Sequence, residues 1–301
     1  MRITFILIVL FLLVFLLLPG VALGANPPPY GPDLMEHLCT PDPTYSLKEG
    51  EFLLPILLYH LVGREAQERN GRSISRFNVT ATDFEAQLAL LQRLGYHSVT
   101  VSEVAAALEG TTTLPERPIV LTFDDGWREQ YEVAFPLLQR YGMRATFFVT
   151  TSYIGYSRFM TWEELAELRD AGMEIASHGR KHLNLADADD KEAWREIARS
   201  KGALEEKLGI SVVSFAYPYG AYRKGLPAML ERAGYRIAVG VGGTPVHRLG
   251  GRYYLRRMEV SGFHSLRAFV DRLPWRGAGS PLCASEMGSG GRVSLIPAIL
   301  P

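Results

Sequence analysis

The chain has 301 residues, of which 47% are hydrophobic and 21% are charged, as expected of a globular protein with a substantial core. Lysine plus arginine and aspartate plus glutamate both number 32, so the formal net charge is zero. This balance argues against a broad basic field for nucleic acid or for an anionic membrane surface, and we expect no nucleic-acid partner.

Residues 1–24 differ from the rest of the chain in being almost entirely apolar. A single Arg2 precedes "ITFILIVLFLLVFLLLPGVALGAN", in which a Pro-Gly break and small residues follow the apolar run. The pattern predicts a secretory signal peptide. A retained N-terminal membrane anchor is the alternative, although the run of about 16 residues is slightly short of the roughly 20 in a full span. Both alternatives predict that the protein works outside the cytoplasm.

Two stretches of biased composition flank the expected domain. Residues 25–51 are rich in proline, glycine and polar residues and are predicted to be a linker, and residues 276–301 are predicted to be a flexible tail. The folded domain is therefore expected over residues 52–275. The two cysteines, Cys39 and Cys283, lie in the flanking stretches. Outside the cytoplasm they could form a disulfide that joins the two ends, or remain two unpaired thiols.

Within residues 52–275, a glycine recurs between an amphipathic helical stretch and a short β-rich run. The runs that follow are "HSVTV", "RATFFVT", "EIASH", "SVVSFAY" and "IAVGV", and the glycines are Gly95, Gly142, Gly172, Gly209 and Gly234. Such a glycine supplies the left-handed residue that ends a helix. The alternation predicts an α/β fold with a parallel sheet and outer helices. About seven strands favour a (β/α) barrel, irregular or incomplete, over an open sheet.

Two helix starts and the first strand can also be predicted. Thr82-x-x-Glu85 and Thr161-x-x-Glu164 have the spacing of capping boxes, in which each threonine begins a helix. The apolar run "FLLPILLYH", which ends at His60, is expected to be the first barrel strand.

Four predicted strand ends carry chemically active side chains. They read "LLYH", "TFDD", "IASH" and "FAYPYG", and their active residues are His60, Asp124 with Asp125, His178, and Tyr217-Pro218-Tyr219. Each group alone has an ordinary structural explanation, as a core histidine, a helix cap, a surface pair or a turn. In a parallel barrel, however, the carboxyl ends of all strands meet at one rim, where the chemistry of such folds occurs. Their convergence predicts an active site.

The adjacent Asp124 and Asp125 indicate a cation. Two neighbouring carboxylates repel one another, and burial increases the cost of both charges. His178 and His182 in "SHGRKH" are spaced i, i+4, and on a helical turn this spacing would place both rings on one face. Two histidines and one carboxylate form a three-ligand site with open positions, typical of catalytic Zn²⁺ or an iron-type divalent metal. One aspartate would bind the metal, and the other would remain free as a base.

These motifs resemble the polysaccharide deacetylases, the NodB-like carbohydrate esterases, over residues 55–269. "LTFDDG" and "SHGRKH" are similar to the metal-site motifs of that family, and "FAYPYG" to its groove motif. "PILLYHLV" resembles the branch that acts on extracellular poly-N-acetylglucosamine and cell-wall glycans. The resemblance implies a hydrolase that removes N-acetyl groups from an N-acetylglucosamine-containing polysaccharide, with one divalent metal ion, for which we expect Zn²⁺.

The resemblance also implies roles for individual residues. Asp124 would be the catalytic base, and Asp125, His178 and His182 would bind the metal. The backbone N–H of Tyr219 would stabilise the oxyanion.

The remaining roles concern the groove and the catalytic acid. Tyr217 and Pro218 would line the substrate groove beside Tyr219. No Leu-x-His motif supplies the usual C-terminal acid, so His60 is expected to take this role, as in the branch with the N-terminal "YH". His264 in "SGFHS" is the alternative.

Two positions depart from the family pattern. Gly179 follows the first ligand histidine, where the family usually has serine or threonine. The arginine that commonly precedes the Pro-Tyr motif and contacts the base is missing, and Arg257 is expected to reach the base from another strand.

Two other classes of function are open at this point. A barrel glycosidase would need carboxylates on different strands, about 5 Å or about 6.5–9.5 Å apart, which the adjacent aspartates fit poorly. A non-catalytic module that binds cell-wall glycan would need no metal. The residues do not distinguish between peptidoglycan, poly-N-acetylglucosamine, chitin and smaller oligosaccharides as the substrate.

Overall fold

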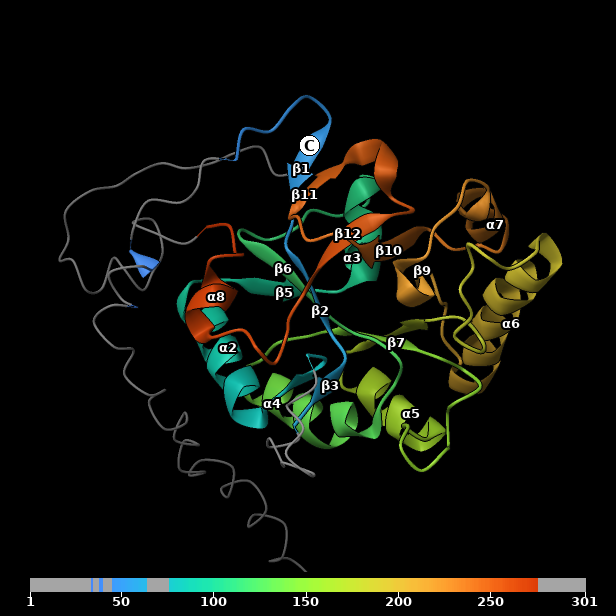
Figure 1. The fold of residues 1–301 in the computed structure, drawn as a ribbon, viewed down its shortest axis with the longest axis horizontal. Coiled ribbons are helices and arrows are strands. Elements are labelled where there is room, and N and C mark those ends of the chain that lie inside the picture. The colour runs from blue at the N-terminus through green and yellow to red at the C-terminus, as the bar shows by residue number, and fades with distance from the viewer. Residues whose placement is uncertain (1–33, 35–37, 40–44, 64–75, 276–301) are drawn as a thin grey trace, which may run out of the picture.

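A barrel of parallel strands forms the centre of the computed structural model, which describes residues 45–63 and 76–275 together with residues 34, 38 and 39 (Figure 1). The barrel strands are β2 (Ile56–Tyr59), β6 (Pro118–Phe123), β7 (Thr146–Val149), β8 (Glu174–Ser177), β9 (Ser214–Ala216), β10 (Ile237–Val241) and β12 (Leu255–Glu259). They follow the order β2-β12-β10-β9-β8-β7-β6, and pairing between β2 and β6 closes the ring. The predicted (β/α) barrel of about seven strands is confirmed, and it is closed rather than incomplete.

Strand β6 is the most heavily paired strand of the barrel. It pairs along one side with β2, and along the other with β5 (His97–Val99) at its start and with β7 at its end. All six of its residues are buried. Because every pair in the barrel is parallel, the carboxyl ends of its strands meet at one rim.

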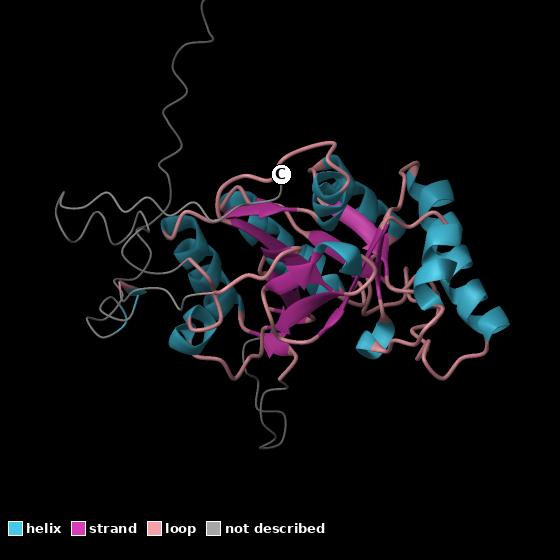
Figure 2. Cartoon of the chain, turned by 90° about the horizontal axis from the view of Figure 1, so that it is seen from above, coloured by secondary structure: helices cyan, strands magenta, loops and turns pink. Residues whose placement is uncertain are grey.

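Helices surround the barrel (Figure 2). They are α2 (Ala81–Arg93), α3 (Val101–Leu108), α4 (Phe135–Arg140), α5 (Trp162–Asp170), α6 (Asp190–Leu208), α7 (Leu226–Arg232) and α8 (Leu266–Val270). A π-helical segment, η1 (Gln130–Ala134), directly precedes α4, and two short 3₁₀ turns are η2 (Pro218–Gly220) and η3 (Leu249–Gly251). Two small sheets complete the fold, β1 (Glu51–Leu53) with β11 (Val246–Arg248) and β3 (Leu61–Val62) with β4 (Asn78–Val79).

The local signals for helix ends are largely confirmed. All five junction glycines have positive φ, at Gly95 (78°), Gly142 (62°), Gly172 (85°), Gly209 (64°) and Gly234 (85°). Thr161 forms the predicted capping box with Glu164. The box predicted at Thr82 is wrong, because Thr80 already caps α2 by accepting from the backbone N–H of Asp83, which places Thr82 inside the helix.

The expected first strand is divided in two by Pro55. Proline has no N–H and cannot continue a ladder of hydrogen bonds, so the chain changes partners there. Residues before Pro55 form β1, which pairs antiparallel with β11, and residues after it form the barrel strand β2. The prediction of one continuous strand was therefore wrong, although His60 still follows the barrel strand directly.

The alternation of side chains along the strands separates an inner from an outer core. The inner cluster includes Ile56, Val120 and Leu255 from three barrel strands, whereas the neighbouring Leu57 and Leu121 belong to the outer cluster beneath the helices. This period of two continues to the rim. The side chains two residues beyond Val120 and Leu255 along their strands therefore also point into the barrel.

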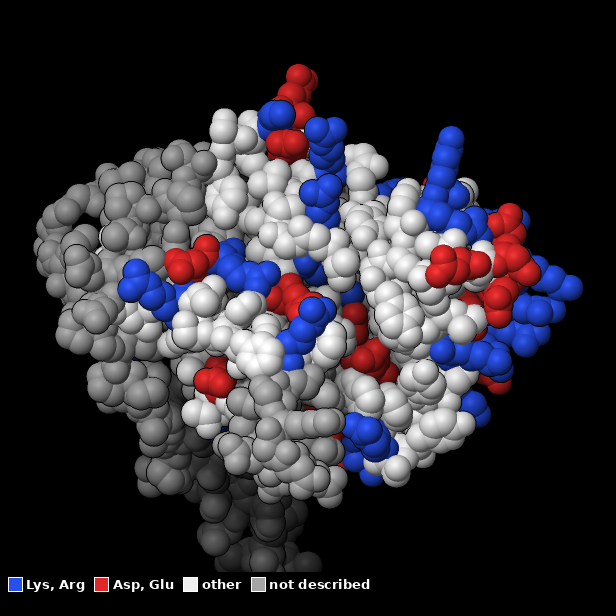
Figure 3. All heavy atoms as spheres, viewed as in Figure 1, with Lys and Arg blue, Asp and Glu red and all other residues white. Residues whose placement is uncertain are grey.

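Charged side chains of both signs are interspersed over the face drawn in Figure 3, as the zero net charge predicts. No helix within the described part of the chain is both long enough and apolar enough to cross a bilayer. Residues 1–24, residues 276–301 and Cys283 lie outside the described residues. The signal or anchor, the tail and the disulfide therefore stay predictions.

His247 on β11 gives the fold a testable dependence on pH. Its buried ring packs on Phe52, its Nε2–H donates to the carbonyl of Leu54 at 2.8 Å, and burial lowers its pKa from 6.5 to about 4. Between these values only the unfolded chain binds the proton, so the contribution to stability is complete above about pH 6.5 and is lost as the pH falls toward about 4. At about 1.4 kcal/mol per unit, the loss amounts to about 3 kcal/mol.

Urea titrations at a series of pH values will measure the contribution of His247 to the free energy of unfolding. His247→Gln should flatten the decline in the free energy of unfolding between pH 6.5 and 4. His97→Gln, which removes an imidazole from an exposed position, controls for the loss of a histidine as such. An unchanged slope in His247→Gln would contradict the assignment.

Candidate active site

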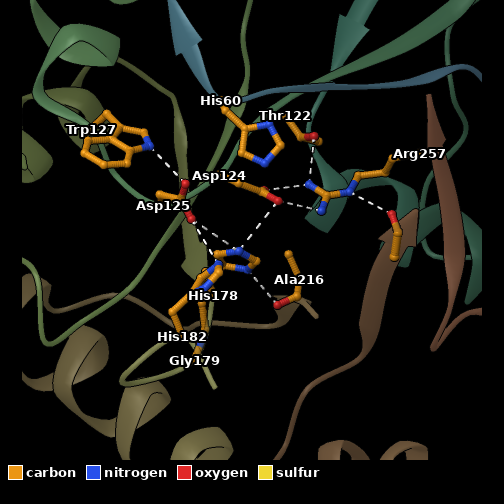
Figure 4. A network of polar contacts seen from close by, with 12 residues as sticks. His60, Thr122, Asp124, Asp125, Trp127, His178, Gly179, His182, Ala216 and Arg257 are labelled. Atoms are coloured by element: carbon orange, nitrogen blue, oxygen red, sulfur yellow. Dashed lines mark hydrogen bonds and ion pairs between the residues drawn. The ribbon is translucent and has the colours of Figure 1, made fainter. Parts of the chain in front are cut away.

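The predicted strand-end residues meet at the carboxyl rim of the barrel (Figure 4). His60 directly follows β2, Asp124 directly follows β6, and His178 directly follows β8. Arg257 lies within β12 and points at the same cluster from the opposite side in Figure 4. Residues separated by up to 197 positions, the interval from 60 to 257, are thereby brought into one group.

Asp124 is held by a buried ion pair with Arg257. The carboxylate is 2% exposed, and its two oxygens accept from the guanidinium of Arg257 at 2.6 and 2.7 Å. Arg257 also donates to the hydroxyl of Thr122 and to the carbonyl of Gly240, which fix its orientation. Burial opposes ionisation, but the charge of Arg257 and its hydrogen bonds to the carboxylate outweigh it, so the pKa of Asp124 lies below its ordinary value. The carboxylate is therefore ionised over the neutral pH range.

Asp125 turns away from Asp124 because its backbone is left-handed, with a φ of 76°. Its Oδ1 lies 3.6 Å from Nε2 of His178 and 3.3 Å from Nε2 of His182. Its Oδ2 accepts from the indole Nε1–H of Trp127 at 2.9 Å. Burial opposes ionisation, but the hydrogen bond from His182 outweighs it and holds the pKa of Asp125 below its ordinary range. One oxygen is thus engaged by Trp127, and the other faces the histidines.

The two histidines do not lie on a helical turn, as the spacing had predicted, but in an irregular loop after β8. Gly179 (φ 77°) and His182 (φ 59°) adopt left-handed conformations that bend the loop until the two ring centroids are 4.9 Å apart. Nδ1 of His178 lies 2.9 Å from the carbonyl of Ala216, which only accepts, so Nδ1 carries the proton. Burial lowers the pKa of His178. A neutral ring with its Nε2 lone pair directed at Asp125 results.

Asp125, His178 and His182 fit a divalent metal. Their ligand atoms all lie within 4.8 Å of one another. With bonds of about 2.0–2.1 Å, tetrahedral ligands are separated by about 3.3–3.4 Å, close to the observed distances of 3.3 and 3.6 Å between Asp125 and the two rings. The hydrogen bond from His178 to a carbonyl is the usual support of a metal-binding imidazole. Asp124 is 3.7 Å from His178 but lies outside this group of converging ligand atoms, and each of its oxygens accepts one hydrogen bond from Arg257.

The loop between the histidines is held by Glu196, which the sequence patterns did not single out. This carboxylate on α6 is 3% exposed, and its Oε2 accepts from the backbone N–H groups of Arg180 at 2.9 Å and Lys181 at 2.6 Å. A Cβ at position 179 would lie 3.4 Å from the same oxygen and 3.6 Å from Pro218. Glycine thus fits the left-handed conformation at this departure from the family pattern, whereas a Cβ would meet these two atoms at ordinary van der Waals distances. The available signal in the sequence was a glutamate among the mostly apolar positions on one face of the helix, such as Ala193, Ile197 and Leu204.

The ring of Trp127 contacts two neighbouring side chains. Phe159 stacks on it at 4.4 Å between centroids, and the guanidinium of Arg158 lies 4.9 Å from its ring centroid. Its indole N–H orients Asp125. The sequence reasoning missed this function, although the position two residues after Asp125 was the available signal.

The two candidate acids have different surroundings. His60 is half-buried beside Phe77, and its ring lies next to Asp124 and Asp125 in Figure 4. Its charge is among those that lower the pKa of both aspartates. His264 instead accepts from the backbone N–H of Ser261 and lies 3.3 Å from the guanidinium of Arg272. Burial and Arg272 lower the pKa of His264.

The predicted groove residues divide into buried and exposed side chains. Tyr217 is fully buried, with its hydroxyl donating to the carbonyl of Tyr253, and Pro218 is also buried. Both side chains are thus buried, Tyr217 within the outer core, and their place in the substrate groove stays a prediction. Tyr219 is 68% exposed, has a φ of 61°, and lies edge-on to His182 at 4.5 Å between centroids. It is the available groove residue.

Comparisons with known sequences agree with this geometry. The family model described as polysaccharide deacetylase matches residues 111–238. YxkH of Bacillus subtilis (strain 168), whose name assigns it provisionally to the polysaccharide deacetylases, is 32% identical over 216 residues, covering 72% of this chain and 74% of that protein. A poly-β-1,6-N-acetyl-D-glucosamine N-deacetylase of Staphylococcus aureus (strain MRSA252) is 25% identical over 242 residues, covering 73% and 83%.

A solved structure supports the same relationship. The Streptococcus pyogenes deacetylase PplD in complex with acetate superposes with a TM-score of 0.69 at 25% identity, covering 74% of this chain and 98% of that one. The members of the matched family are amide hydrolases. The match to the family model and the identity to YxkH show that the chain belongs to the polysaccharide deacetylase family.

Proposed function

We propose that the protein is a metal-dependent enzyme that removes N-acetyl groups from an N-acetylglucosamine-containing polysaccharide outside the cytoplasm. The observation that carries this proposal is the rim itself. Three ligand atoms of Asp125, His178 and His182 converge beside an ionised carboxylate, Asp124, that takes no part in the ligand set. A divalent ion held there would lower the pKa of a bound water and polarise the acetyl carbonyl.

The residues of the chain supply the remaining chemistry. Asp124 accepts a proton from the attacking water, and Arg257 keeps this carboxylate ionised and in place. The N–H of Tyr219 donates to the oxygen that becomes negatively charged as water adds to the acetyl carbon. His60, next to the aspartates, donates a proton to the departing amine. Trp127 and Glu196 hold the ligand residues in position.

The substrate class is supported by a relative and by the surface of the site. The S. aureus relative is named for poly-β-1,6-N-acetyl-D-glucosamine, whose N-acetyl groups are the chemical target that this site fits. The exposed ring of Tyr219 offers a face for a sugar beside the predicted ligand His182. The adjacent aspartates remain a poor match for a glycosidase, because they follow one strand rather than two.

The location and the metal are further parts of the proposal. The apolar segment 1–24 supports secretion or attachment at the outer face of the membrane. Zn²⁺ is the proposed ion, because two imidazoles and one carboxylate with open positions match its catalytic sites.

An acetate-release assay will test the function. Purified protein with Zn²⁺ should release acetate from at least one of poly-β-1,6-N-acetylglucosamine, peptidoglycan and chitin oligosaccharides. A chelator should abolish the release, and restored Zn²⁺ should recover it. Reducing ends without acetate would identify a glycosidase instead.

Substitutions at the two aspartates should separate their roles. Asp124→Asn should retain about one metal per chain but lose about 10²–10⁴-fold in kcat, because the base is removed. Asp125→Asn should lose affinity for the metal, as should His178→Ala. Elemental analysis and kinetics together check both expectations. An empty site in Asp124→Asn with a filled site in Asp125→Asn would show that the roles are reversed.

His60 should behave as a general acid. An amine expelled without a proton is a very poor leaving group, so His60→Ala should lower kcat by about 10²–10⁴-fold. Metal content and melting temperature should stay near those of the wild type, and the basic limb of the pH–rate profile should weaken. His264→Ala serves as the comparison. A large loss in His264→Ala with near-normal turnover in His60→Ala would transfer the role to His264.

A further inference from the structure

The proposed acid and base follow the two strands that close the barrel. Strands β2 and β6 pair up to Tyr59 opposite Phe123, and the N–H of Asp124 donates to the carbonyl of Tyr59 at 3.0 Å. Beyond this bond the two chains separate. After His60 the chain enters β3, which pairs with β4, and after Asp124 it turns through the left-handed Asp125.

Gln130 joins the two chains at the point where they separate. Its side chain belongs to η1 and is fully buried. Its Nε2 lies 2.7 Å from the carbonyl of His60 and 2.6 Å from the carbonyl of Asp124. Carbonyl oxygens only accept, so the amide nitrogen must face both of them, and its two hydrogens serve one carbonyl each. One side chain therefore ties the backbone of the acid to the backbone of the base.

The arrangement of the Gln130 side chain leaves its amide oxygen without a hydrogen bond among the described residues. This oxygen, Oε1, is buried. Unpaired buried acceptors are rare, and each one calls for an explanation. Gln130 also begins a π-helical segment, a local widening that is frequent at functional sites. Both features are explained if glutamine is required at position 130 for the two hydrogen bonds of its amide nitrogen, even though its amide oxygen then has no partner.

We propose that Gln130 is a positioning residue that fixes the separation between His60 and Asp124, and this inference rests on the proposed function of those two residues. A proton taken from water on one side and delivered to the amine on the other requires both groups at fixed distances from one acetyl carbon. A displacement of about 1 Å can lower a rate by about 10²-fold. The amide clamps the backbone that carries each group, beyond the last bond of the ladder.

A second buried glutamine provides a matched control. Gln87 on α2 is 2% exposed, and its Oε1 accepts from the hydroxyl of Tyr59 at 2.9 Å, one residue before His60. Its contact is with a core side chain and not with the backbone of the acid or base. Gln87→Met and Gln130→Met thus remove the same amide from neighbouring buried sites with the same change in shape.

The experiment measures acetate release per metal-loaded, folded protein. Gln130→Met should lower kcat by about 10–100-fold with KM and metal content unchanged, whereas Gln87→Met should keep the wild-type kcat even if both variants melt at lower temperature. Gln130→Glu, which keeps the chain length but loses the paired donors, should also be slow. In the His60→Ala background, Gln130→Met should lower kcat by a markedly smaller factor than in the wild type, because the acid that Gln130 positions is already absent.

The outcomes separate this inference from the proposed function. A wild-type protein that releases no acetate overturns the proposed function and this inference with it. An active wild type with a fast Gln130→Met, or equal losses of kcat in the two methionine variants, overturns the inference alone. So does a loss in Gln130→Met that is undiminished when His60 is alanine, since a purely structural role would be additive.

Discussion

Two adjacent carboxylates at the end of a buried strand impose the constraint around which the rim is built. Asp124 and Asp125 cannot both be ionised there without separate partners. The left-handed conformation of Asp125 directs the two side chains apart, so that Arg257 binds one and the histidines face the other. A buried charge left without its partner costs about 3–5 kcal/mol. The arginine partner makes Asp124 a fixed, ionised carboxylate that can act as the proposed base, and the histidine partners make Asp125 the proposed metal ligand. The same arrangement therefore separates the two charges and assigns their two roles.

The alternation of side chains along the barrel strands places these partners together. Val120 and Leu255 point into the barrel, so Asp124 and Arg257, at even spacing from them, point inward as well. A register shift of one residue in either strand would move its charged side chain to the outer core. Closure of the ring by β2 then places His60 beside β6. The parallel topology thus sets both the charge partner of Asp124 and the position of the proposed acid.

Local strain is concentrated at the same rim. Asp125, His182 and Tyr219 are three of the described non-glycine residues with positive φ, and each such conformation costs about 1–3 kcal/mol. The surrounding structure holds these positions. Trp127 binds the carboxylate of Asp125, and Glu196 binds the backbone that leads to His182. Such strain persists only where neighbouring contacts over-determine it, so these supports are as much a part of the site as the residues that they hold.

The sequence by itself determined what depends on near neighbours: the helix ends at glycine, the β-rich runs after them, and hence the parallel barrel whose rim gathers the motifs. It also singled out Asp124, Asp125 and His178 because polar side chains stand at the ends of apolar runs, and His182 because of its spacing from His178. Only the tertiary structure decided the left-handed loop between the histidines, the burial of Tyr217, and the side chains that support the rim from distant elements. These features depend on contacts between residues far apart in the chain. A local pattern of polarity and spacing does not specify which distant residue will pair with a buried polar group.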